Sequence, residues 1–143
     1  MLIALARTGD DRAEPVINEK ISQLKPDMEF SHFRAAALAS EAMPSDQDAL
    51  YFEKLLLDPS IRGNDKADLQ DAVNSVPPGP TDTTQRNKEL KELYLARALF
   101  VCGDPSGIAR KILEKYANDL HGHYSRHASA ILSGAALDCV SAG

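Results

Sequence analysis

Residues 4–11 read ALARTGDD, and residues 98–105 read ALFVCGDP, a related stretch that lies 94 positions later in the chain. Both stretches begin with an apolar segment that contains alanine, and both lead into a Gly-Asp pair. Similarity at a fixed offset is typical of repeated structural units. The interpretation of the whole chain therefore depends on whether further copies exist.

The Gly-Asp pair in each stretch has the chemistry of a tight turn between two helices. Gly9 and Gly103 suit the left-handed conformation that follows the last residue of many helices. The aspartate after each glycine suits the cap of the next helix. Residues 43–46, which read MPSD, are expected to form a similar turn between two helices without glycine. Each copy is thus predicted to form helix, turn and helix.

Two further copies are indicated by short alanine motifs. Residues 37–39 lie 33 positions after the first motif, and residues 130–132 lie 32 positions after the motif at residue 98. The interval from residue 37 to residue 98 is 61 positions, so it holds one repeat and an insertion. The chain is predicted to contain about three and a half repeats.

The two helices of each copy differ in composition. The first helices, predicted over residues 33–42, 95–102 and 124–136, are rich in alanine, which permits neighbouring helices to approach closely. The second helices are amphipathic. In the third copy Ile112, Leu113 and Tyr116 share one face, which is typical of a helix that packs on its neighbours.

An insertion is predicted over residues 59–87. It contains the run PPGPTDTT at residues 77–84, whose prolines are incompatible with a helix interior. A short helix is predicted from about residue 66 to residue 73, and the rest is expected to be an exposed loop. Loops of this length are commonly either functional or mobile.

These motifs resemble the HEAT family of helical repeats, and in particular the short bacterial HEAT-like type. The resemblance rests on residues 4–10, 34–39 and 98–104 and covers most of the chain outside the insertion. It implies an all-α, α-α superhelix, or HEAT-like solenoid, in a single domain over residues 1–143. Because both ends lack capping units, we expect the chain to be a fragment of a longer protein.

Composition and charge disfavour several classes of function. The net charge is −5, and no dense run of Lys and Arg occurs, so nucleic-acid binding is not expected. No apolar stretch approaches the length that spans a bilayer, so a soluble chain is predicted, either cytoplasmic or exported as part of a longer protein. Cys102 and Cys139 have no C-x-x-C spacing and are expected to be buried thiols.

Three of the four histidines cluster at residues 121–127, and they offer the strongest candidate chemistry. His123 and His127 would share a helix face and could hold a metal ion with Asp119 as the third ligand. However, His127 also falls on the predicted apolar stripe, where a histidine is usually packed and hydrogen-bonded. We therefore expect no metal and no other cofactor.

A polar ridge at the junctions between repeats is the candidate interaction site. It would comprise His32, Arg34, Asp119, His123, Arg126 and His127. Arginines there could bind a carboxylate in bidentate fashion. The alternative is purely structural, with the same groups satisfying helix ends and contacts between repeats.

The sequence therefore favours a non-enzymatic scaffold that binds a partner protein or the remainder of its parent chain. No catalytic residues are assigned. The resemblance also permits an appended domain of a larger bacterial enzyme. A metal-dependent hydrolase with a site near residues 119–127 is the alternative.

Overall fold

The computed structural model describes residues 1–74, 79 and 83–134, and within these residues the fold is all-helical, without strands. A 3-10 turn at Asp11–Ala13 precedes the second of eight described α-helices. Their bounds are α1 Leu2–Arg7, α2 Glu14–Ser22, α3 Phe30–Ala42, α4 Asp46–Leu56, α5 Leu69–Asn74, α6 Thr84–Val101, α7 Ile108–Ala117 and α8 Gly122–Leu132. The predicted all-α class is confirmed.

The turns between paired helices have the predicted chemistry. Gly9 has a φ of 66°, and the side chain of the next residue, Asp10, accepts a hydrogen bond of 2.9 Å from the amide of Arg12. Gly103 has a φ of 109°, and both carboxylate oxygens of Asp104 accept bonds from amides in the first turn of α7. Both turns combine a left-handed glycine with an aspartate that binds the orphan amides of the following helix.

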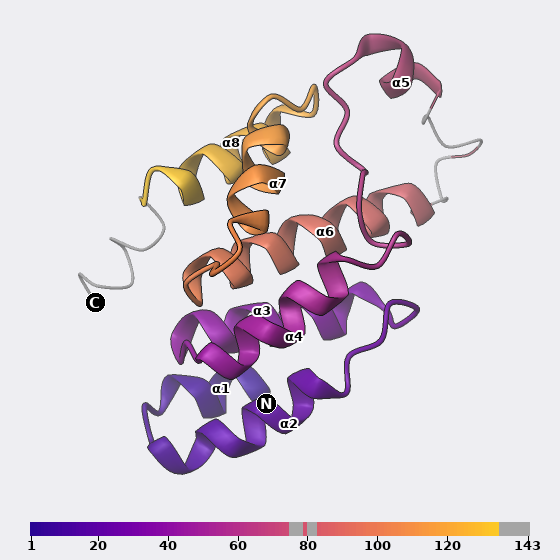
Figure 1. Ribbon diagram of the computed structural model, residues 1–143. Helices are drawn as coiled ribbons and strands as arrows, with labels where there is room; N and C mark the ends of the chain where they lie inside the picture. Colours follow the sequence, from indigo (N-terminus) through magenta and orange to yellow (C-terminus); the bar gives the residue numbers. More distant parts are fainter. Residues whose placement is uncertain (75–78, 80–82, 135–143) are drawn as a thin grey trace.

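The helices pack in a regular order along the molecule (Figure 1). Helix α3 contacts α1 and α6, and α6 also contacts α8. On the other side of this series, α2 contacts α4, and α4 contacts α6. Short side chains line the contacts within the first series, because Ala36, Ala37, Ala96 and Ala128 are all buried. This arrangement agrees with the close helix approach expected from the alanine-rich segments.

Helix α6 begins eleven residues before the predicted start at residue 95, and this is the largest difference from the sequence prediction. The first four residues of α6 fall within the predicted insertion at 59–87, and residues 88–94 were assigned to neither the insertion nor the helix. Two charged side chains of this unassigned stretch, Glu89 and Glu92, are buried. The predicted insertion at 59–87 therefore ends before Thr84, where α6 begins.

The start of the insertion is also not the exposed loop that was predicted. Ile61 is only 2% exposed, and Asn64 is buried. A short helix does follow, as α5, although it begins at Leu69 rather than near residue 66. The proline-rich residues 75–78 and 80 lie outside the described part of the chain, as do residues 135 and 136 of the predicted last helix.

Two smaller predictions concern the membrane and the thiols. None of the described helices is both long and apolar enough to cross a bilayer. Cys102 is buried and not in a disulfide, as expected, and burial raises the pKa of its thiol to about 11. Cys139 lies outside the described residues.

Candidate functional site

The six residues of the predicted ridge occupy two separate parts of the fold. His32 and Arg34 lie on α3, whereas His123, Arg126 and His127 lie on α8. Helix α6 packs between α3 and α8. In the described part of the chain, no hydrogen bond or ion pair joins the α3 residues to the others.

His127 is held in a bridge that crosses three helices. Its Nε2 lies 2.9 Å from Nη1 of Arg97 on α6, and the same guanidinium forms a two-point ion pair with Glu41 on α3. Because arginine can only donate, Nε2 must accept, so its lone pair is occupied. Burial, together with the charges of Arg97 and His123, lowers the pKa of His127 to about 4. The side chain is therefore neutral and structural at ordinary pH.

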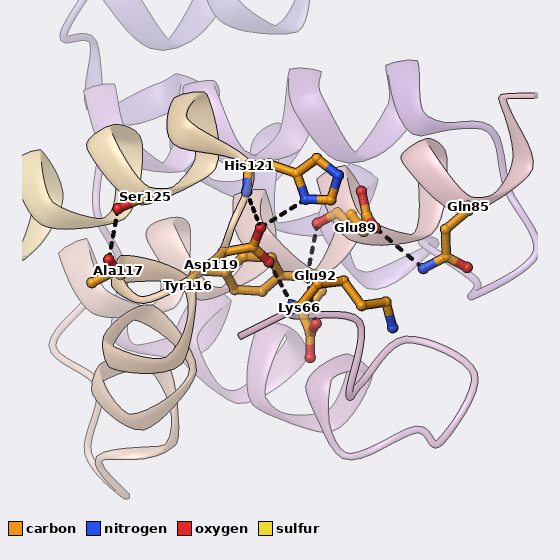
Figure 2. Close-up of polar contacts among 9 residues, drawn as sticks. All are labelled: Lys66, Gln85, Glu89, Glu92, Tyr116, Ala117, Asp119, His121 and Ser125. Atoms are coloured by element: carbon orange, nitrogen blue, oxygen red, sulfur yellow. Dashed lines mark hydrogen bonds and ion pairs between the residues drawn. The ribbon is translucent and has the colours of Figure 1, made fainter. Parts of the chain in front are cut away.

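Asp119 has a fully buried side chain that fastens the insertion to the start of α8 (Figure 2). Its Oδ2 accepts a bond of 2.6 Å from the amide of Lys66, 53 residues earlier in the chain. Its Oδ1 accepts from the amide of His121 at 2.8 Å and lies 2.7 Å from Nδ1 of the same residue. Asp119 thus has two partners, Lys66 and His121, and neither was among the residues of the predicted ridge.

A second buried carboxylate, Glu92 of α6, holds the residues just before Lys66. Its Oε2 accepts a bond of 2.7 Å from the amide of Gly63, and its Oε1 accepts from the amide of Asn64 at 3.0 Å. The hydroxyl of Tyr116 on α7 also donates to Oε1, at 2.7 Å. Burial and the charge of Glu92 raise the pKa of Tyr116, so the phenol keeps the proton that it donates.

These two carboxylates and their partners form what we call the carboxylate lock: Gly63, Asn64, Lys66, Glu92, Tyr116, Asp119 and His121. Charge at the lock is stabilised by six donors: four backbone amides, the hydroxyl of Tyr116 and Nδ1 of His121. The contacts join segments that are distant in the sequence, which fixes the insertion, α6 and the α7–α8 turn relative to one another.

The metal-binding alternative finds little support in these positions. Among the residues that the structure describes, no group of three or more His, Cys, Asp or Glu side chains is arranged to hold a metal ion. Asp119 and His127 are committed to other partners, as set out above. His123 is exposed, and its ring lies against that of Tyr124, with a centroid distance of 4.0 Å.

The opposite end of the molecule has an apolar groove, of about 370 Å³, between α1, α2 and α3. We call it the N-terminal groove. Its apolar lining includes Leu2, Leu5, Val16, Leu24, Met28 and Ala36. Two basic side chains, Lys20 and His32, also line it, and none of the described residues lines it with a carboxylate. Val16 remains 45% exposed on its wall.

Only His32 of the predicted ridge belongs to the N-terminal groove, whereas Arg34 is exposed elsewhere on α3. The groove could not be predicted from the sequence, because its residues have the spacing of ordinary core positions. A detectable signal was that Val16 and Leu24, which lie on and just after α2, continue an apolar pattern whose outer neighbour is not identified by the sequence. Comparisons with protein-family models, with curated proteins and with solved structures gave no match.

Proposed function

We propose that this chain is a non-enzymatic protein-interaction module, built as a HEAT-like stack of helical hairpins. On this proposal, the N-terminal groove receives an amphipathic helix of a partner protein, with apolar side chains along one face and carboxylates beside them. The observation that carries the proposal is the apolar groove whose described lining includes Lys20 and His32 but no carboxylate side chain.

The helix order supports the HEAT-like part of the proposal. Helices α1, α3, α6 and α8 would be the first helices of successive hairpins, and each contacts the next. Helices α2, α4 and α7 would be the second helices. Stacks of this kind leave their terminal faces and long sides available for binding.

The size and composition of the groove support a helical ligand. Its volume of about 370 Å³ can take several aliphatic side chains. An amphipathic helix presents such side chains at positions i, i+3, i+4 and i+7, and apolar grooves commonly bind helices in this way. Burying each leucine or valine of the ligand removes apolar surface from water, which favours binding.

The charge of the groove supports an acidic rather than a basic ligand. Lys20 lies on α2, and its ammonium would attract carboxylates that flank the apolar face of the incoming helix. The same ammonium would repel the positive side chains of a basic helix. Because these groups lie at the surface, the effect should be modest and should weaken with salt.

A binding assay with designed peptides tests this function. The probe is a fluorescent amphipathic peptide of about 14 residues, with Leu along one face and Glu on both flanks, and its counterpart carries Lys in place of Glu. We expect the Glu peptide to bind with a dissociation constant on the order of 100 μM, and the Lys peptide to bind several-fold more weakly at low salt.

The variant Val16→Glu should weaken binding of the Glu peptide at least about tenfold, because it places a carboxylate in the groove. The matched control is Leu50→Glu, which changes an exposed apolar residue of α4 that does not line the groove. Equal binding of the two peptides at low salt, or equal effects of the two variants, would contradict the proposal.

A further inference from the structure

Helix α5 is a short helix whose apolar side chains are exposed. None of its residues is buried, and Leu69 and Val73 are 71% and 56% exposed. The two side chains are four positions apart, so they share one face of the helix. Helix α5 thus presents a two-residue apolar anchor to solvent.

The segment around α5 is acidic. Asp65, Asp68 and Asp71 lie within seven positions, and Lys66 is the one basic residue among them. The carboxylate of Asp68 accepts bonds from the amides of Gln70 and Asp71, so it caps the helix. The segment therefore combines an apolar face with a negative charge, which is the chemistry that we assigned to the ligand of the N-terminal groove.

The groove of the same chain is out of reach of α5. Residues 63–66 are fastened to α6 and to Asp119 by the carboxylate lock, only a few residues before α5 begins. Helix α5 lies at one end of the molecule, whereas α1 and α2 lie at the other (Figure 1). Contact between α5 and a groove therefore requires two molecules.

We propose that α5 of one copy of this chain docks in the N-terminal groove of a second copy, with Leu69 and Val73 as anchors. The inference rests on the proposed function, because it supplies the groove with a specific occupant. The two surfaces differ, so the contact is head-to-tail and does not close through a two-fold axis. However many copies are added, the assembly has an unoccupied groove at one end and an unoccupied α5 at the other.

The contact is small, and the association is accordingly weak. One short helix with two anchors buries far less surface than a stable interface. We expect a dissociation constant on the order of 100 μM to 1 mM. Self-association should appear as oligomers whose mean mass increases continuously with protein concentration.

Sedimentation equilibrium of the full chain, from about 10 μM to about 1 mM, tests this inference. The wild-type mass should rise beyond that of a dimer. The double variant Leu69→Ala/Val73→Ala and the groove variant Val16→Glu should each remain monomeric. The control variant Leu50→Ala, which changes an equally exposed leucine, should associate as the wild type does.

Mixing the two impaired variants makes the test specific. The copy with an altered α5 retains its groove, and the copy with an altered groove retains its α5, so the mixture should form dimers and stop there. A wild-type chain that stays monomeric at about 1 mM, a wild-type mass that stops at dimer, or a mixture that fails to associate would overturn the inference.

The peptide assay separates this inference from the proposed function. If the Glu peptide binds the groove and the chain nevertheless stays monomeric, the inference about α5 fails and the proposed function stands. If neither the peptide nor a second copy binds, both fail. If both are correct, the Glu peptide should dissociate the oligomers by competing for the groove.

Discussion

The two ends of the molecule differ in how their side chains are partnered. At the carboxylate lock, Glu92 and Asp119 are buried, and each of their oxygens accepts at least one hydrogen bond. At the N-terminal groove, apolar side chains line an open hollow that no polar contact closes. The first end is fixed by specific donors and acceptors, and the second is left with surface that a partner could cover.

Buried carboxylates also differ between the two halves of the chain. Glu92 has donors for both oxygens, whereas Asp48 of α4 is fully buried with only one oxygen satisfied. Its Oδ2 accepts from the hydroxyl of Ser40, but its Oδ1 has no hydrogen-bond partner among the described residues. A buried carboxylate whose two oxygens both accept hydrogen bonds holds its donors in place. A buried carboxylate with an unpaired oxygen destabilises the folded state.

The largest expected effect comes from breaking the lock. The variant Glu92→Ala would leave the amides of Gly63 and Asn64 without their acceptor, and a buried donor costs about 1–3 kcal/mol when unpaired. It would also remove the shorter of the two hydrogen bonds of the Tyr116 hydroxyl, which lies 3.4 Å from the carbonyl oxygen of Glu89 as well. We expect the free energy of unfolding in urea to fall by about 3–5 kcal/mol. The control variant Glu114→Ala, at an exposed position of α7, should change it by less than about 0.5 kcal/mol. Similar losses for the two variants would contradict the fastening role.

A smaller effect is expected from Asp48→Asn, and it should depend on pH. Burial, partly offset by the Ser40 hydroxyl, raises the pKa of Asp48 to about 6 in the folded chain, against an ordinary value of 3.8. The folded state therefore binds this proton more tightly than the unfolded state does, and its stability falls as pH rises from about 4 to about 6.

The amide in Asp48→Asn removes the buried charge and this pH dependence. We expect the variant to be more stable than the wild type by about 2 kcal/mol at pH 7, and to lose that advantage near pH 4. Urea unfolding at several pH values measures both quantities. A variant that is less stable than the wild type at pH 7 would show that the charge is not the dominant cost.

The variant His127→Gln should change the stability less than Asp48→Asn does. The pH dependence that it removes has the opposite sign, because His127 destabilises the fold as the pH falls. The pKa of His127 is lowered to about 4 in the folded chain, so its contribution to stability is present above about pH 6.5 and is lost as pH falls toward 4. Gln keeps an acceptor for Arg97 but does not titrate. Relative to the wild type, we expect the variant to gain on the order of 1 kcal/mol between pH 6.5 and pH 4. An unchanged difference over that range would contradict the neutral, buried assignment.

The sequence predicted those parts of the fold that depend on local chemistry. The turns at Gly9 and Gly103 follow from left-handed glycines and capping aspartates, which act within a few residues. The packing and hydrogen bonding of His127 were expected from its place on an apolar stripe. The repeat register and the family resemblance remain predictions.

The parts that could not be predicted depend on contacts between distant residues. The predicted helix began at residue 95, and the burial of Glu89 and Glu92 in the earlier half of α6 depends on partners on other segments. Asp119 was placed in the candidate site, but its partner Lys66 is 53 positions away. The N-terminal groove was missed because an uncovered apolar face and a covered one have the same sequence pattern.

The most direct test of the account is to map the binding site of the Glu peptide by NMR on the isotopically labelled chain. If the peptide binds in the N-terminal groove, its addition should change the amide chemical shifts of groove residues such as Leu5, Lys20 and Ala35. The lock amides of Gly63, Lys66 and His121 should stay unchanged. Shifts that concentrate at the lock, with none at the groove, would contradict it.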